Sequence, residues 1–196
     1  MRQKTISAVY SYYEQLRAGR AAPLRSEINP AELKAALPDV FMLEQLKDAS
    51  FSFRLAGTRT CLVFGREARN TDFAAIWEPN SARRMVLAAQ SVLATGQILK
   101  VDLIARGVEE PEFGLEMLLM PLSSKPGVVD RIFGCLAADD PTRPLTALHR
   151  WLLPTRLQFL TDEHMPRSIL PSVEQAAPAQ PANRPLFRVI DGGRRD

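Results

Sequence analysis

The sequence predicts an α+β domain in which a five-stranded antiparallel sheet has helices on one face. Short segments with apolar residues at every second position are separated by turns across residues 41–138. A longer segment, 80–95, has its apolar residues at helical spacing instead. Two strands precede this helix and three follow it, and such grouping is typical of α+β domains.

The first predicted element is an amphipathic helix over residues 4–18, which Gly19 ends. Its apolar residues recur at helical spacing: Ile6, Val9, Tyr10, Tyr13 and Leu16. Because this helix precedes the sheet, its apolar side must cover the sheet or meet another subunit. Both alternatives stay open, and the second makes Tyr10, Tyr13 and Leu16 candidate interaction residues of a homodimer.

Segments 41–46 and 51–56 are predicted to form an antiparallel hairpin. Phe51, Phe53 and Leu55 alternate with polar residues, so these three should share the buried face. After Gly57, a short helix should run from Thr58 to Gly65, and a polar loop should return to the core at Phe73, Ile76 and Trp77.

The long helix, capped at Asn80 or Ser81, should end at Gly96. Strands are then predicted over 98–105, 113–119 and 132–138. Gly134 in the last of them allows a close approach of another part of the backbone. Asp102 and Glu116 fall at the polar positions of neighbouring strands, which predicts a solvated sheet face.

Beyond residue 140 the sequence predicts a helical extension and a tail. A helix is predicted from Leu145, Leu148, Trp151 and Leu152, with Pro154 interrupting it. A proline-rich linker leads to apolar residues that are candidate partner contacts: Leu186, Val189 and Ile190. The predicted parts are therefore 1–28 (helix and loop), 29–140 (domain), 141–170 (helical extension) and 171–196 (linker and tail).

Two segments resemble the PAS domain family. FGREARNTDFAAIW (64–77) is similar to the glycine-containing segment that follows the second strand in PAS domains. RLAGT (54–58), with the preceding strand FMLE (41–44), resembles a narrower group, the small single-domain PAS-like proteins of alphaproteobacteria. The resemblance covers about residues 10–139.

The resemblance implies signal transduction through a protein partner, gated by a small apolar ligand. Such a ligand would lie between the sheet and the helices, against Phe53, Leu55, Phe64, Met85, Val101, Met117 and Phe133. The same residues would equally form a filled core. A sensor whose main function is ligand binding is the first alternative. An enzyme using Asp102, Glu116 or His149 is the second, although the sequence brings no catalytic groups together.

No cofactor is expected. PAS domains that hold haem usually ligate iron through a histidine, and no histidine occurs before His149. Thr71 stands where light-sensing flavin domains of the family have their reactive cysteine. Cys61 and Cys135 lie in apolar segments without metal-ligand spacing, as free thiols of a reducing cytoplasm do.

The bulk properties fit a cytoplasmic regulatory protein. The 196 residues carry a net charge of +3, and the basic residues form pairs rather than a patch, so no nucleic-acid partner is expected. No apolar stretch is long enough for a membrane span, and no signal peptide is evident.

Overall fold

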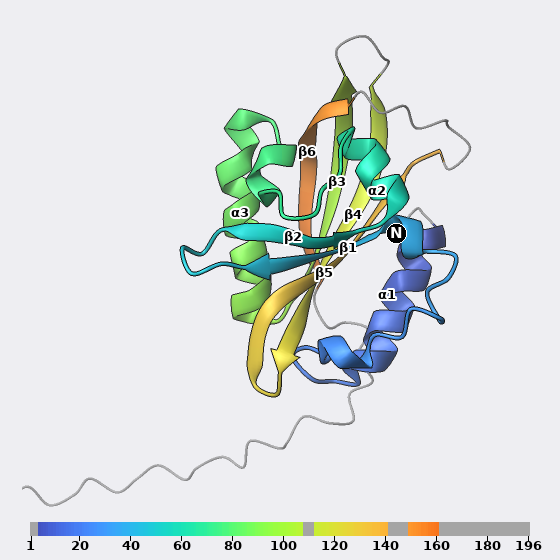
Figure 1. Ribbon diagram of the computed structural model, residues 1–196, viewed down its shortest axis with the longest axis vertical. Coiled ribbons are helices and arrows are strands. Elements are labelled where there is room, and N and C mark those ends of the chain that lie inside the picture. Colours follow the sequence, from blue (N-terminus) through green and yellow to red (C-terminus); the bar gives the residue numbers. More distant parts are fainter. Residues whose placement is uncertain (1–3, 108–111, 141–148, 161–196) are drawn as a thin grey trace, which may run out of the picture. The chain divides into compact units, whose positions relative to one another are not determined.

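A six-stranded antiparallel sheet organises the residues that the computed structural model describes, 4–107, 112–140 and 149–160 (Figure 1). The strands follow the order β2-β1-β5-β4-β3-β6 across the sheet. They span Val40–Gln45 (β1), Phe51–Ala56 (β2), Ile98–Gly107 (β3), Phe113–Lys125 (β4), Val128–Ala138 (β5) and His149–Leu160 (β6). The α+β prediction is confirmed, with six strands rather than five. These residues belong to one unit, Met1–Met165, and a second unit, Pro166–Asp196, lies outside the described residues.

Three α-helices and three short 3-10 helices accompany the described strands. The α-helices are Lys4–Arg17 (α1), Thr58–Phe64 (α2) and Pro79–Thr95 (α3), and the 3-10 helices are Arg25–Glu27 (η1), Leu37–Asp39 (η2) and Phe73–Ile76 (η3). The predicted stops are confirmed: Gly65 and Gly96 close α2 and α3 with φ of 66° and 69°. Glycine suits these positions because a side chain would strain the left-handed backbone.

The sheet carries a hydrophobic core on each face. Helices α2, η3 and α3 cover one face, and we call the cluster beneath them the main core. Helix α1 covers the opposite face through Ile6, Val9 and Tyr13, and we call this cluster the second core. Figure 1 shows α1 and α3 on opposite sides of the sheet. Helices α2 and α3 thus share one face as predicted, and α1, whose place the sequence left open, covers the other face.

Strand β6 replaces the helix predicted around Trp151 and Leu152. It pairs antiparallel with β3 along its length, from His149 opposite Gly107 to Leu160 opposite Ile98. The edge of β3 offers unpaired backbone groups to this segment, and a proline is tolerated in an edge strand. The helical extension is thus corrected over 149–160, while its remaining residues lie outside the described ranges.

Candidate functional site

The RLAGT segment holds helix α2 against the start of the sheet. A Cβ atom at Gly57 would overlap the carbonyl oxygens of Leu37 and Pro38, so only glycine fits this approach. Two residues later, Arg59 donates from Nε to Asp39 Oδ1 at 2.6 Å and from its Nη2 group to Oδ2. This two-pronged ion pair, together with the glycine contact, fixes α2 over the main core.

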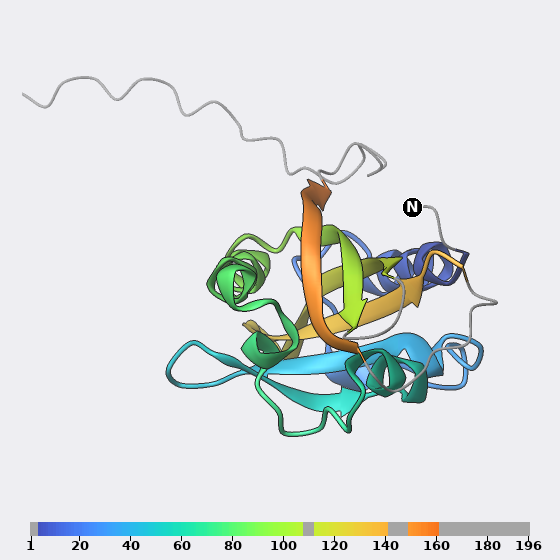
Figure 2. The same ribbon diagram turned by 90° about the horizontal axis from the view of Figure 1, so that it is seen from above.

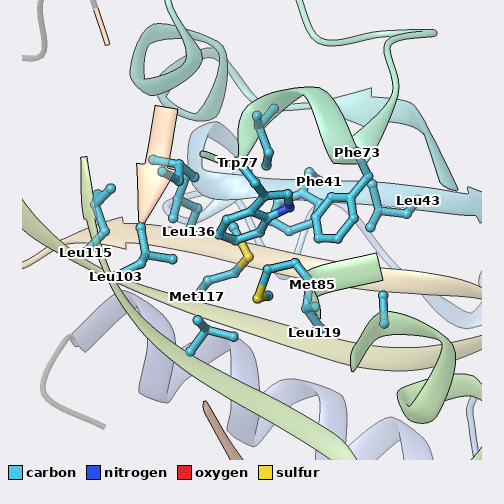
Figure 3. Packing of buried hydrophobic residues seen from close by; sticks show 14 of the residues in the cluster. Phe41, Leu43, Phe73, Trp77, Met85, Leu103, Leu115, Met117, Leu119 and Leu136 are labelled. Carbon is cyan, nitrogen blue, oxygen red and sulfur yellow. The ribbon is translucent and has the colours of Figure 1, made fainter. Parts of the chain in front are cut away.

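Aromatic rings in mutual contact fill the centre of the main core. Phe53 lies 5.6 Å from Phe41, 5.4 Å from Phe64 and 6.0 Å from Phe73, measured between ring centroids. Phe73 in turn meets Trp77 edge to face at 5.4 Å. Figure 3 shows the Trp77 indole among Phe41 and the methionines Met85 and Met117. The space where a ligand was expected is therefore largely occupied by side chains.

Five of the seven predicted ligand residues come together in the main core: Phe53, Phe64, Met85, Val101 and Met117. The other two do not. Phe133 is buried in the second core, because it alternates along β5 with Ile132 and Gly134, which face the main core side. Leu55 is 50% exposed.

A β-bulge explains the exposure of Leu55. Leu43 pairs with Phe53, but its neighbour Met42 pairs with Leu55, so Arg54 is an extra residue on β2. One extra residue reverses the side on which the following side chains lie. Leu55 therefore shares the face of Met42, away from the main core. The sequence contains no signal for this bulge.

Two polar groups in the main core were not predicted. Nε1 of Trp77 and the hydroxyl of Thr60 are buried, and neither has a hydrogen-bond partner among the described residues. Thr60 lies on the side of α2 that carries Val63 and Phe64 into the core, as its spacing of three and four residues requires. A buried indole N–H usually finds a partner, so the unpartnered Trp77 Nε1 departs from the usual arrangement.

The predicted interaction residues of α1 differ in how deeply they are buried. Tyr13 is fully buried in the second core, and its hydroxyl donates to Pro121 O at 2.6 Å. Burial raises the pKa of this phenol. Tyr10 and Leu16 are half-buried. Tyr13 therefore packs on its own domain, whereas the tail candidates Leu186, Val189 and Ile190 lie outside the described residues.

Charged residues on β3 and β4 form a buried cluster instead of the expected solvated face. Lys100 Nζ lies 3.0 Å from Asp102 Oδ1 and 2.9 Å from Glu116 Oε1, and Glu116 is fully buried. Partial burial lowers the pKa of Lys100, but its hydrogen bonds to the two carboxylates outweigh this and leave the pKa raised. Lys100 thus pairs with both carboxylates, and we interpret the cluster as structural.

The remaining candidate chemistry is sparse within the described ranges. No three His, Cys, Asp or Glu side chains there are grouped as metal ligands would be. Thr71, in the place of the flavin-reactive cysteine, donates its hydroxyl to Ala68 O at 2.6 Å. Burial raises the pKa of both thiols, Cys61 and Cys135. None of the helices described here combines the length and the apolar character that crossing a bilayer requires.

Comparison with known proteins identifies the family. The PAS domain family model matches residues 1–137, more than half of the chain. No curated protein matches. Among solved structures, the chain is similar to an RNA-binding light-oxygen-voltage receptor, with 20% identity and a TM-score of 0.40. That match covers 55% of this chain and 31% of the receptor chain. On the family match, this chain belongs to the PAS domain family.

Proposed function

We propose that this protein is a non-enzymatic regulator whose binding to a protein partner is gated by a small molecule in the main core. Membership of the PAS family points to a sensory or signalling role. The observation that carries the ligand is that two buried polar groups, Trp77 Nε1 and the Thr60 hydroxyl, each lack a partner among the described residues.

The two groups define the chemistry of the proposed ligand. An indole N–H only donates a hydrogen bond, whereas a threonine hydroxyl both donates and accepts. The surrounding rings and methionines offer no charge to balance an ion, so a neutral ligand is favoured. A small apolar molecule with a carbonyl oxygen would satisfy Trp77. Met85 and Met117 are adaptable enough to make room for it.

Trp77 also connects the core to a sheet edge. Its backbone forms an isolated parallel bridge with Leu152 of β6, and Glu78 N donates to Leu152 O at 3.0 Å. Leu152 is itself buried in the main core. A ligand that shifts the indole therefore acts directly on β6, which leads into the C-terminal residues where partner binding is proposed.

Native mass spectrometry and fluorescence test the gate. A Trp151→Phe variant leaves Trp77 as the single fluorescent tryptophan. We expect acetophenone, a small neutral aromatic ketone, to shift its emission saturably, and protein purified gently from its host to retain a small-molecule mass. A Trp77→Phe variant keeps a ring but lacks the N–H, so it should lose the retained mass. If the purified protein carries no ligand and acetophenone has no saturable effect, the gate is refuted.

Partner binding is tested separately. The tail residues Leu186, Val189 and Ile190 are apolar and follow a proline-rich linker, which suits addition to a partner's sheet edge. Deleting residues 185–196 should abolish capture of partners from host extract while the circular dichroism spectrum stays unchanged. If the deletion changes no interaction, the tail is not the output.

A further inference from the structure

We infer that the outer edge of β6 pairs with the same edge of a second copy of this chain, joining two sheets into one. The inference does not depend on the proposed ligand or on the tail. It rests on three features of β6: a backbone edge that nothing covers beyond Pro154 within the described residues, an exposed aromatic side chain, and a sequence that complements itself across a two-fold axis.

The two edges of the sheet differ in where other parts of the chain pair with them. At the β2 edge, Phe53 N donates to Thr71 O at 3.0 Å, and Asn70 N donates to Phe53 O at 2.7 Å. A further bridge joins Ser52 to Asp72. The chain itself therefore covers this edge at Ser52 and Phe53, which hinders another strand from adding there.

The β6 edge is covered only near its beginning. The bridge between Trp77 and Leu152 lies there, and Pro154, which has no N–H to offer, follows it. Beyond this point, no other backbone group in the described ranges reaches the outer edge of Thr155–Leu160. Figure 2 shows β6 at the margin of the sheet beside β3. Within the described residues, a strand can therefore add along Thr155–Leu160.

Apolar and polar side chains alternate on this segment, and the apolar ones on the side of the main core, Leu157 and Phe159, are not fully covered. Phe159 is 36% exposed, and Leu157, two residues away on the same face, is half-buried against the main core. The segment 155–160 carries no acidic residue, and Arg156 is its only charge. An exposed edge of this kind is stable in solution when another strand covers it.

One register of self-pairing satisfies these side chains as follows. With the two-fold axis at Gln158, Leu157 of one copy lies opposite Phe159 of the other, and the reverse pair forms alongside. The two Gln158 amides face each other and can exchange hydrogen bonds, since an amide both donates and accepts. Arg156 then faces Leu160. A register centred on Arg156 would instead place like charges directly opposite, which is unfavourable.

This dimer uses a different surface from the one predicted at α1. Tyr13 is buried within its own domain, so it has no side chain to offer a second copy. The residues of β6 that would form the pair are exposed or half-buried, and their backbone outer edge is open within the described residues. A two-fold edge pairing is closed, because each copy offers the same edge to the other.

Two variants with opposite charges at position 158 test the register. We expect light scattering of the full chain to give a dimer mass at tens of micromolar. Gln158→Arg and Gln158→Glu should each weaken dimerisation by about fivefold, because each places like charges on the axis. An equimolar mixture of the two variants should restore a heterodimer. Gln15→Arg and Gln15→Glu, at an exposed position of α1, should change nothing.

Two further measurements address the edge itself. Phe159→Lys, which adds the charge that natural edges use, should give a monomer of unchanged circular dichroism. Amide exchange at 155–160 should be slow in the dimer and become fast on dilution. A wild-type monomer at tens of micromolar overturns the inference. So does a dimer indifferent to position 158 and Phe159→Lys, or exchange that is slow at every concentration, which would mean that the chain covers its own edge.

Discussion

Gly134 is a position where one added methyl group should disturb the main core. Gly134 lies on β5 opposite Phe41 of β1. A Cβ atom there would lie less than 3.0 Å from Cζ, Cε1 and Cε2 of the Phe41 ring, and the farthest of these would be 2.6 Å away. Ordinary contact begins at 3.4 Å and the nearest atom, Cζ, would lie 2.1 Å away, so this part of the ring must retreat by about 1.3 Å, the difference between the two values.

The retreat is opposed because Phe41 is fully buried and packs on Phe53 at 5.6 Å. Overpacking of this kind costs about 1–3 kcal/mol, while alanine in a strand regains about 0.5–1 kcal/mol over glycine. We therefore expect Gly134→Ala to lower the free energy of unfolding by about 1–2 kcal/mol, measured by urea denaturation followed by circular dichroism.

A double-mutant cycle isolates the contact. Leucine lacks the three ring atoms that an alanine at position 134 would meet, so Phe41→Leu should remove most of the added strain. The double variant should be more stable than the sum of the single effects by about 1 kcal/mol. Gly127→Ala is the control, because no atom lies within 4 Å of its added Cβ and only its φ of +78° opposes the change. A neutral Gly134→Ala, or additivity with Phe41→Leu, would refute the reasoning.

Three further predictions concern the two cores. Phe53→Ala should destabilise by about 3–5 kcal/mol and Leu55→Ala by less than about 1 kcal/mol in urea titrations, because only Phe53 is buried; equal losses would contradict the bulge. The raised pKa of Tyr13 means that its stabilisation is complete below about pH 10 and is lost as the pH rises further, so Tyr13→Phe should flatten the alkaline loss of stability, and an unchanged alkaline profile would contradict it. Lys100→Met should lower the free energy of unfolding by about 3–5 kcal/mol in thermal or urea unfolding, because it leaves the buried Glu116 without its partner. Adding Glu116→Met should recover much of this loss, and no recovery would show that Glu116 is not the main partner of Lys100.

Local signals in the sequence were sufficient for the three α-helices and for the C-terminal ends of α2 and α3. The predicted cap of α3, Asn80 or Ser81, was wrong, because α3 begins at Pro79 with Glu78 as its N-cap. Helix α3 follows from apolar residues at helical spacing, and the glycines at 65 and 96 stop α2 and α3 because left-handed backbone admits few other residues. The return of Phe73, Ile76 and Trp77 to the core was also predictable, and all three are buried.

The candidate site was only partly predictable, because strand residues take their side from their partners. Phe53 was placed correctly, but the bulge opposite Met42 and Leu43 turned Leu55 outward two residues later. Phe133 shows the same dependence, since either face of a sheet with a core on both sides accepts an apolar residue. The missing partners of Trp77 Nε1 and Thr60 are a property of packing and have no counterpart in residue order.

Composition, periodicity and turn residues thus decided the class of fold and the order of its elements up to residue 138, because these depend on interactions between near neighbours along the chain. Tertiary contacts decided the rest. Residues 149–160, whose apolar spacing resembled that of a helix, form strand β6 because they pair with the otherwise unpaired edge of β3. Helix α1 packs on the second face of the sheet in its own domain, where Tyr13 is buried and donates to Pro121 O. Both outcomes depend on which backbone edges and apolar faces remain uncovered after the sheet has formed, and that is known only once distant strands are paired.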